Sequence, residues 1–302
     1  MKRKIAMAAI GLWLAAASTG AVDVFVSILP QKYFVEKIGG SQVTVSVMVT
    51  PGASPATYEP APRQMAALAS AEIYFSIGVP FEHVWLPKLS AANANLRIVP
   101  TDHGIAKREI ETFHSILQGA GDGAQEHGHD HHEHAHESGM DPHIWLSPSL
   151  VKLQAAVICS ALAELDPPHA GLYQANLAAF NLQLDDLDME LRAVFDGLPE
   201  PRSFMVFHPS WGYFADTYGL KQIPVELEGK EPKPAHLAAL IQMARQRGIR
   251  VIFVQPQFSS RSAQVIAREI GGRVSSADPL AEAWADNLRR QAAAFREVLS
   301  HE

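Results

Sequence analysis

The chain has 302 residues, of which 47% are hydrophobic and 19% are charged, and its formal net charge is −7 at pH 7. This acidic balance argues against nucleic acid or an anionic membrane as a partner, because both bind basic surfaces. The one cysteine, Cys159, excludes an internal disulfide and a thiolate zinc cluster, and it lies in an apolar helical pattern that predicts a core position.

Residues 1–21 have the features of a secretory signal peptide. Cations at 2–4 are followed by an apolar run over 5–17 and by small residues at 18–21, where cleavage is expected. The run is too short for a membrane span, and no cysteine stands at the cleavage site to carry a lipid. We expect a soluble, periplasmic chain that starts near Val22, with its formal net charge moved from −7 to −10 by the loss of three cations.

Short apolar runs alternate with helical patterns in the first half of the mature chain. The runs are rich in β-branched residues, which favour strands, and the stretches between them fit helices. The predicted strands cover 22–28, 43–49, 73–77 and 96–99, and the predicted helices cover 31–38, 62–70 and 81–89. Strands separated by helices predict a parallel sheet that is covered on both faces.

A histidine-rich tract interrupts the chain at residues 122–137, which read DGAQEHGHDHHEHAHE. It has no large apolar side chain, so burial cannot offset its ordering entropy and we expect disorder. Imidazole is a common ligand of borderline-soft divalent metals, so the tract predicts auxiliary zinc binding. The alternative is a solvated spacer or a tag, but tags stand at chain ends and this tract lies between two structured halves. Its histidines are His127, His129, His131, His132, His134 and His136.

Two helical stretches and a second alternation of strands and helices follow. Helices are predicted at 149–165, 168–195, 210–218, 235–247, 261–270 and 280–298, and strands at 204–207, 223–227 and 251–254, with a weak one around Val274. We therefore predict an α/β fold with two (β/α) lobes, parallel-type sheets, one long rigid linking helix and an interlobe cleft. The predicted division is a lobe at 22–148, a helical connection at 149–198 and a lobe at 199–302.

Three residues are candidate metal ligands. His143 lies between two nearby prolines, which rigidify its segment, although a helix-capping histidine is an alternative. His208 follows the apolar run at 204–207, where open parallel sheets bind their ligands, although a buried structural histidine fits the same pattern. Asp278 lies where a strand ends and a helix starts, so its alternative role is that of an N-cap.

The three candidates together form a more specific pattern than any one of them. Two imidazoles and one carboxylate, from strand ends in both lobes, make a common ligand set for zinc, so we expect them to converge on one metal. The other histidines are expected to have surface or structural roles. They are His83, His103, His114, His169, His236 and His301.

Short motifs spread over nearly the whole mature chain carry a family resemblance. They include SILP at 27–30, PGASP at 51–55, YEP at 58–60, DPHIW at 141–145, HPSWGYF at 208–214, YGL at 218–220, GKEP at 229–232 and DPL at 278–280. In this order they resemble the zinc- and manganese-binding solute-binding proteins of metal ABC importers, the periplasmic zinc-binding type in particular. The resemblance implies Zn²⁺ as cargo in an interlobe site, with His143, His208 and Asp278 as ligands, and hand-over to a membrane permease.

One position departs from this family pattern. Zinc-type relatives carry a histidine directly after the turn at 51–55, whereas this chain has Ala56, whose methyl group cannot coordinate a metal. Zinc prefers four donors. The missing donor is therefore expected to be water, a histidine of the 122–137 tract, or Glu59.

Three alternative functions stay open at this point. One is a carrier of manganese or another divalent metal, although histidine at 208 favours zinc because manganese-type relatives tend to carry glutamate there. Another is a metal buffer or adhesion protein without a transporter. The third is a periplasmic zinc hydrolase, but the chain has no H-E-x-x-H, G-x-S-x-G or Walker motif, so we expect no enzyme. The expected chain is a monomer whose partners are the permease and a periplasmic metallochaperone.

Overall fold

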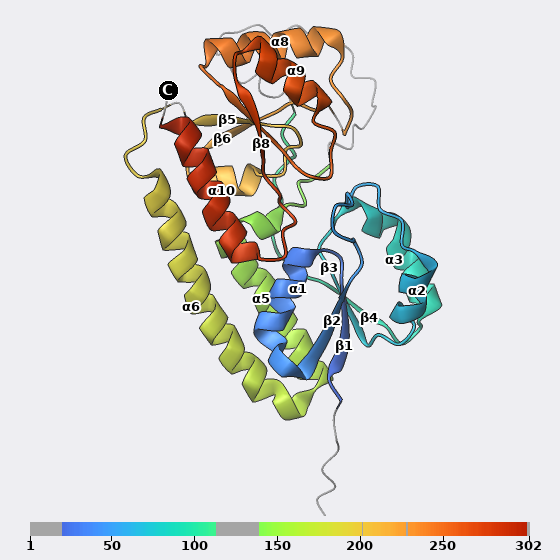
Figure 1. The fold of residues 1–302 in the computed structure, drawn as a ribbon. Coiled ribbons are helices and arrows are strands. Elements are labelled where there is room, and N and C mark those ends of the chain that lie inside the picture. The colour runs from blue at the N-terminus through green and yellow to red at the C-terminus, as the bar shows by residue number, and fades with distance from the viewer. Residues whose placement is uncertain (1–19, 113–138, 201, 228, 301–302) are drawn as a thin grey trace, which may run out of the picture.

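The protein folds into two parallel sheets joined by long helices, and the prediction of an α/β fold is confirmed (Figure 1). Most of the predicted signal peptide and the whole histidine-rich tract lie outside the described residues. The computed structural model describes residues 20–112, 139–200, 202–227 and 229–300.

The first sheet has four parallel strands in the order β2-β1-β3-β4. Its strands are β1 (Val22–Val26), β2 (Val43–Val47), β3 (Ile73–Ser76) and β4 (Arg97–Pro100), and its helices are α1 (Leu29–Gly39), α2 (Pro62–Leu68) and α3 (Pro80–Ala92). Strand β3 is wholly buried, as expected for a sheet that helices cover. All three helices have a proline in the first turn, where a backbone N–H has no partner within the helix.

The second sheet repeats this pattern, with four parallel strands in the order β6-β5-β7-β8. Its strands are β5 (Ser203–Val206), β6 (Lys221–Pro224), β7 (Val251–Val254) and β8 (Arg273–Ser276), and its helices are α7 (Gly212–Thr217), α8 (Pro234–Gln246), α9 (Arg261–Glu269) and α10 (Trp284–Leu299). Strand β6 starts earlier than predicted because the Lys221 N–H already bonds to the Arg202 carbonyl at 2.9 Å and the polar Gln222 is buried within the strand.

Two long helices join the sheets. Helix α5 covers Pro148–Leu165 and, after a 3-10 turn at Pro167–His169, helix α6 covers Ala170–Phe195. The predicted linking helix thus becomes α-helical two residues after Pro168, because its prolines lie in the 3-10 turn. Helix α6 packs against α5, α1 and α10, so it contacts elements of both halves of the fold (Figure 1).

Helix α5 is a core helix. By length and composition alone it could cross a membrane, with a mean hydropathy of 1.3. Its positions Val151, Ala155, Ile158 and Leu162 recur at helical spacing and are buried in the main apolar core. Cys159 is buried in the same core, as the sequence predicts.

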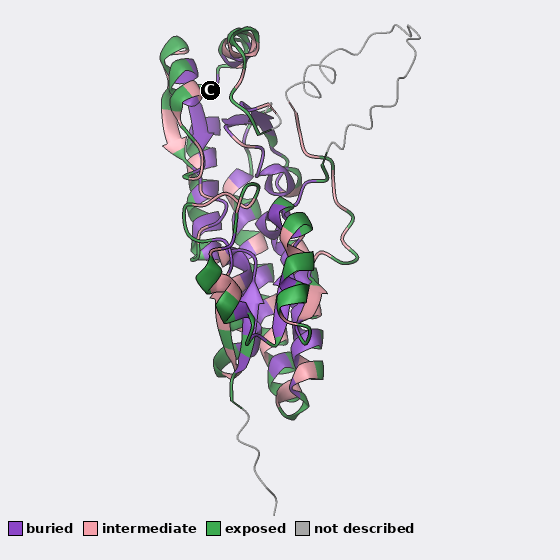
Figure 2. Cartoon of the chain, turned by 90° about the vertical axis from the view of Figure 1, so that its right-hand side faces the viewer, coloured by how far each residue is buried: buried purple, intermediate pink, exposed green. Residues whose placement is uncertain are grey.

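One apolar core runs through both halves of the fold. It includes Val24 of β1, Leu184 of α6, Phe253 of β7 and Phe295 of α10. Figure 2 shows buried residues along the strands and on the inward faces of the long helices. A second, smaller cluster lies between the second sheet and helices α8 and α9. The two lobes therefore share most of their interior and are not independent packing units.

Candidate metal centre

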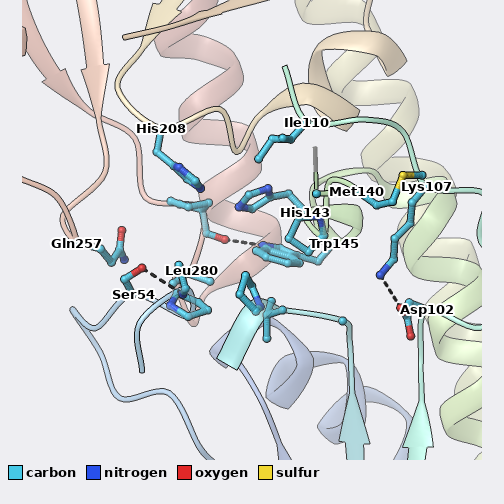
Figure 3. A pocket seen from close by; sticks show the side chains of 18 of the residues that line it. Ser54, Asp102, Lys107, Ile110, Met140, His143, Trp145, His208, Gln257 and Leu280 are labelled. Carbon is cyan, nitrogen blue, oxygen red and sulfur yellow. Dashed lines mark hydrogen bonds and ion pairs between the residues drawn. The ribbon is translucent and has the colours of Figure 1, made fainter. Parts of the chain in front are cut away.

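A cavity of about 900 Å³ lies between the two sheets (Figure 3). Its walls come from the loops after β2 and β3, from the segment that precedes α5, and from loops that follow strands of the second sheet. Loops at the carboxyl ends of parallel strands are the usual ligand sites of α/β folds. The lining residues that bear on metal binding are Ala56, His83, His143, His208, Gln257 and Leu280.

Two of the predicted ligands face each other in this cavity. The ring centroids of His143 and His208 are 5.1 Å apart, with an angle of 68° between the ring planes (Figure 3). The structure therefore brings together an imidazole from the segment before α5 and an imidazole from the end of β5. Their sequence separation is large, so only the fold pairs them.

Each of the two imidazoles is held by a buried carboxylate. His143 Nδ1 lies 2.7 Å from Asp141 Oδ1, and His208 Nδ1 lies 2.8 Å from Glu226 Oε1. Asp141 is fully buried and Glu226 is 5% exposed. Because an ionised carboxylate can only accept, we assign the proton of each ring to Nδ1, which leaves the Nε2 lone pair free to coordinate a metal. Histidines that bind metals commonly have this arrangement.

The fold fixes His208 through the neighbouring strand β7. The His208 N–H donates to Gln255 Oε1 at 3.1 Å, and Gln255 Nε2 donates back to the His208 carbonyl at 2.6 Å. The ring of Phe258 stacks on the imidazole with centroids 4.9 Å apart. Backbone and side chain of His208 are therefore both held in place before any metal arrives, which lowers the entropy cost of binding.

His143 is held by Asp141 through both its backbone and its ring. Its backbone N–H donates to Asp141 Oδ1 at 2.9 Å, and the same oxygen accepts from the ring. Burial lowers the pKa of His143, and the charge of Asp141 opposes that effect only in part. The ring therefore stays neutral, and able to bind a metal, at lower pH than an ordinary histidine.

Asp278 lies beside the cavity but outside the imidazole pair. Its Oδ1 accepts hydrogen bonds from Gln257 Nε2 at 3.1 Å and from the Leu280 N–H at 2.9 Å. Gln257 and Leu280 line the cavity, whereas Asp278 does not. Among the described residues, no group of three or more histidine, cysteine, aspartate or glutamate side chains could hold a metal ion as placed. The predicted three-residue ligand set therefore stays a prediction.

Two tryptophans connect the segments that carry His143 and Asp278. Trp145 Nε1 donates to the Pro279 carbonyl at 2.7 Å, and Trp284 Nε1 donates to the Trp145 carbonyl at 2.8 Å. Helix α10 starts at Trp284 and not at the predicted 280, because the Leu280 N–H bonds to the Asp278 side chain and the chain turns there. Asp278 therefore shapes this turn and does not cap the helix.

The proposed sources of a further donor differ in their placement. Ala56 lines the cavity, as the position of a missing ligand should, but Glu59 is exposed and does not line it. The tract at 122–137 lies outside the described residues. The residues that flank this part of the chain, Ile110 and Gly139, line the cavity, and the Ile110 N–H donates to the Gly139 carbonyl at 3.3 Å.

Asp141 and Glu226 are the functional residues that the sequence interpretation missed. Asp141 stands in the DPHIW motif, which the sequence interpretation used for His143, for its proline and for the family resemblance, but not for the aspartate. Glu226 follows β6, the neighbour of the strand that carries His208. One signal could have predicted the role of Glu226. It is a charged residue just beyond one strand of a parallel sheet when a histidine lies just beyond the adjacent strand.

A buried carboxyl group supports the cavity wall on the first-sheet side. Glu82 is 3% exposed, accepts from the Gly78 N–H at 2.7 Å and from Ser27 Oγ, and Ser27 Oγ also lies 2.7 Å from the Tyr74 hydroxyl. Gly78 has φ of 84°, a conformation that favours glycine, and it lines the cavity. Burial raises the pKa of Glu82 from 4.5 to about 7.

This pKa makes a stability prediction. Between pH 4.5 and 7 the folded protein keeps a proton on Glu82 that the unfolded chain has lost. The contribution of this proton to the free energy of unfolding is therefore fully present below pH 4.5 and is lost as the pH rises through 7. From pH 5 to pH 8, wild type should lose about 2 kcal/mol of unfolding free energy relative to Glu82→Gln. Denaturant unfolding of both proteins at the two pH values measures the difference, and parallel pH profiles would show that Glu82 does not titrate in this range.

Comparison with known proteins identifies the family. The family model described as ZnuA, zinc-uptake complex component A, periplasmic, matches residues 24–298. A crystal structure of ZnuA is 45% identical and covers 93% of this chain and 100% of that chain, with a TM-score of 0.82. A zinc-bound deletion mutant of ZnuA matches with the same identity and TM-score, covering 93% of this chain and 99% of that chain.

More distant relatives agree with this assignment. The high-affinity zinc uptake system protein ZnuA of Bacillus subtilis is 28% identical over 262 residues, which are 83% of this chain and 76% of the relative. The zinc-binding lipoprotein AdcA of Streptococcus pneumoniae is 27% identical over 269 residues, or 86% of this chain, and the chain spans about half (50%) of that relative's length. The chain belongs to the ZnuA family of periplasmic zinc-uptake components.

Proposed function

We propose that this protein captures Zn²⁺ in the periplasm and delivers it to the permease of an ABC-type zinc importer. The observation that carries the proposal is the pair of imidazoles, His143 and His208, each fixed through Nδ1 by a buried carboxylate. This leaves both Nε2 atoms for one ion in one cavity. Membership of a family of transport components, which are not enzymes, supports uptake over hydrolysis. The zinc-bound ZnuA mutant supports zinc as the cargo.

The proposed ligands are His143, His208 and Asp278. Asp278 adjoins Pro279, a residue of the cavity wall, and bonds to Gln257, which lines the cavity as well. A bound ion favours the conformation in which its donors are together. We infer that zinc draws the carboxylate of Asp278 away from Gln257 and towards the two imidazoles.

The histidine-rich tract is proposed as an auxiliary metal binder. Ile110 and Gly139, which lie on either side of this part of the sequence, both line the cavity and are hydrogen-bonded to each other. Tethering imidazoles there raises the local concentration of metal near the main site. The donors proposed in the tract are His127, His129, His131, His132, His134 and His136.

The wider setting is proposed from the family description, which names a periplasmic zinc-uptake complex. The partner is the membrane permease, and a periplasmic metallochaperone is a second candidate. We propose a soluble monomer after cleavage of the signal peptide. The domain division at 22–148, 149–198 and 199–302 is supported by the chain order, in which all strands of the first sheet precede α5 and α6 and all strands of the second sheet follow them.

Direct zinc binding tests this function. Metal-free protein is titrated with zinc in competition with a chromophoric chelator, and crystals soaked in zinc are measured at the zinc absorption edge. One tightly bound zinc per chain is expected, with an anomalous peak between the Nε2 atoms of His143 and His208. A parallel titration with manganese tests the alternative function of a carrier for another metal, which would bind manganese more tightly than zinc. Absence of binding, or a peak away from the imidazole pair, contradicts the proposal.

Glu226 should matter for zinc although it is not a proposed ligand. Glu226→Gln keeps the shape of the side chain but removes the carboxylate that accepts from His208 Nδ1 and orients the ring. The zinc affinity should fall by about tenfold to a hundredfold. The competition titration measures the change, and Glu297→Gln, which alters an exposed glutamate of α10, is the control. Equal affinities for Glu226→Gln and wild type would mean that the carboxylate does not support the metal site.

A further inference from the structure

The cavity wall on the first-sheet side lacks a donor at position 56. Ala56 lines the cavity with a methyl group, and two Nε2 atoms supply only half of the four donors that zinc prefers. If Asp278 joins the imidazoles, one position is still free. A replacement donor on this wall has to come from a side chain close to Ala56.

His83 is on the same wall as Ala56. It lies in the first turn of α3, is exposed, and lines the cavity that contains His143 and His208. The backbone connects the two positions directly, because the Phe81 N–H donates to the Pro55 carbonyl at 3.1 Å. The rings of Tyr58 and Phe81 pack edge to face with centroids 5.8 Å apart, which adds a second contact between the turn and the helix.

The other polar groups of this wall already have partners. Lys107 Nζ and Asp102 Oδ2 form an ion pair at 2.5 Å. Glu82 is buried and accepts hydrogen bonds from Ser27 and from the backbone at Gly78. Within the described part of the chain, the imidazole of His83 makes no hydrogen bond or ion pair, so a metal would not have to displace a partner to bind it.

We propose that His83 supplies the third imidazole of the zinc site and replaces the donor that Ala56 cannot provide. This inference rests on the proposed function and names one further ligand of the same site. As placed, the described side chains hold no metal-binding group of three, so His83 reaches the pair when zinc stabilises a closer approach of the α3 wall. In this arrangement the donor is in helix α3 and not in the turn that carries Ala56, to which α3 is hydrogen-bonded.

Zinc affinity and the imidazole count of the bound metal test the proposal. His83→Ala should weaken zinc binding by about tenfold or more, and X-ray absorption of the zinc complex should show two imidazole ligands where wild type shows three. His103→Ala removes an exposed histidine that does not line the cavity, and it should match wild type. Thermal unfolding of His83→Ala should also match wild type, because the side chain is exposed.

A compensating substitution makes the test specific. Ala56→His in the His83→Ala background should restore both the affinity and the count of three imidazoles, because the two positions are on one wall. Wild-type affinity and three imidazoles in His83→Ala would overturn the inference. The proposed function itself fails on a different result, namely that wild-type protein binds no zinc or that loss of His143 or His208 leaves binding unchanged.

Discussion

Zinc affinity should fall by about a hundredfold when His208 is replaced by alanine, and we expect His143→Ala to have an effect of the same size. Loss of a residue that merely orients a ligand costs tenfold to a hundredfold, so loss of the donor itself should reach the upper end of that range. Each imidazole also balances a buried carboxylate, so its removal leaves Glu226 or Asp141 without its ring partner. The competition titration described above measures both variants.

Two further variants separate metal binding from folding. His208→Gln retains a side-chain donor for Glu226 but lacks the imidazole, so it should keep its stability and still lose zinc. His103→Ala keeps the site intact and should bind as wild type does. If His143→Ala and His208→Ala each still bound zinc tightly, the imidazole pair would not be the metal site. The proposed function would then lose its basis.

Phe295→Ala should lower the free energy of unfolding by about 3–5 kcal/mol. The ring is fully buried, and its centroid lies 4.4 Å from that of Phe204 and 4.7 Å from that of Phe253. Phe295 belongs to the core shared by both sheets, so the cavity left by the truncation weakens contacts of α10 and the second sheet together. Equilibrium unfolding in denaturant gives the difference directly.

The matched control is Leu182→Ala on α6. Leu182 is 67% exposed, so its truncation should change the stability by no more than about 0.5 kcal/mol. Because one core spans the molecule, Phe295→Ala should also unfold in a single transition monitored by both tryptophan fluorescence and circular dichroism. Separate transitions, or equal effects of the two truncations, would mean that α10 is not integral to the common core.

Local patterns predicted most of the fold. The β-branched runs at 22–28 and 251–254 became β1 and β7, because a buried parallel strand requires continuous apolar sequence. The element boundaries that differ from the prediction depend on hydrogen bonds between residues far apart in the sequence. The sequence around 221 and 222 is polar, and it is a strand only because Lys221 pairs with Arg202 and Gln222 finds partners in the interior.

The candidate site was predicted in part. His143 and His208 stand next to prolines and strand ends, which are visible in the sequence, and the structure brings them together. The partnership of Glu226 with His208, and the closeness of His83 to Ala56, depend on tertiary contacts that no local pattern encodes. Sequence analysis assigned His83 to the surface or to a structural role. The exposure of its side chain fits both that assignment and a role as a ligand at the mouth of the cavity.

The two sheets have the same strand order, so β1 and β5 occupy equivalent positions in them. Just beyond β5 the chain carries His208, a proposed zinc ligand that lines the cavity. Just beyond β1 it carries Ser27, which joins Glu82 in an inward-facing group that takes up a proton near neutral pH. If the proposed function holds, metal and protons therefore act at topologically equivalent strand ends of the two sheets.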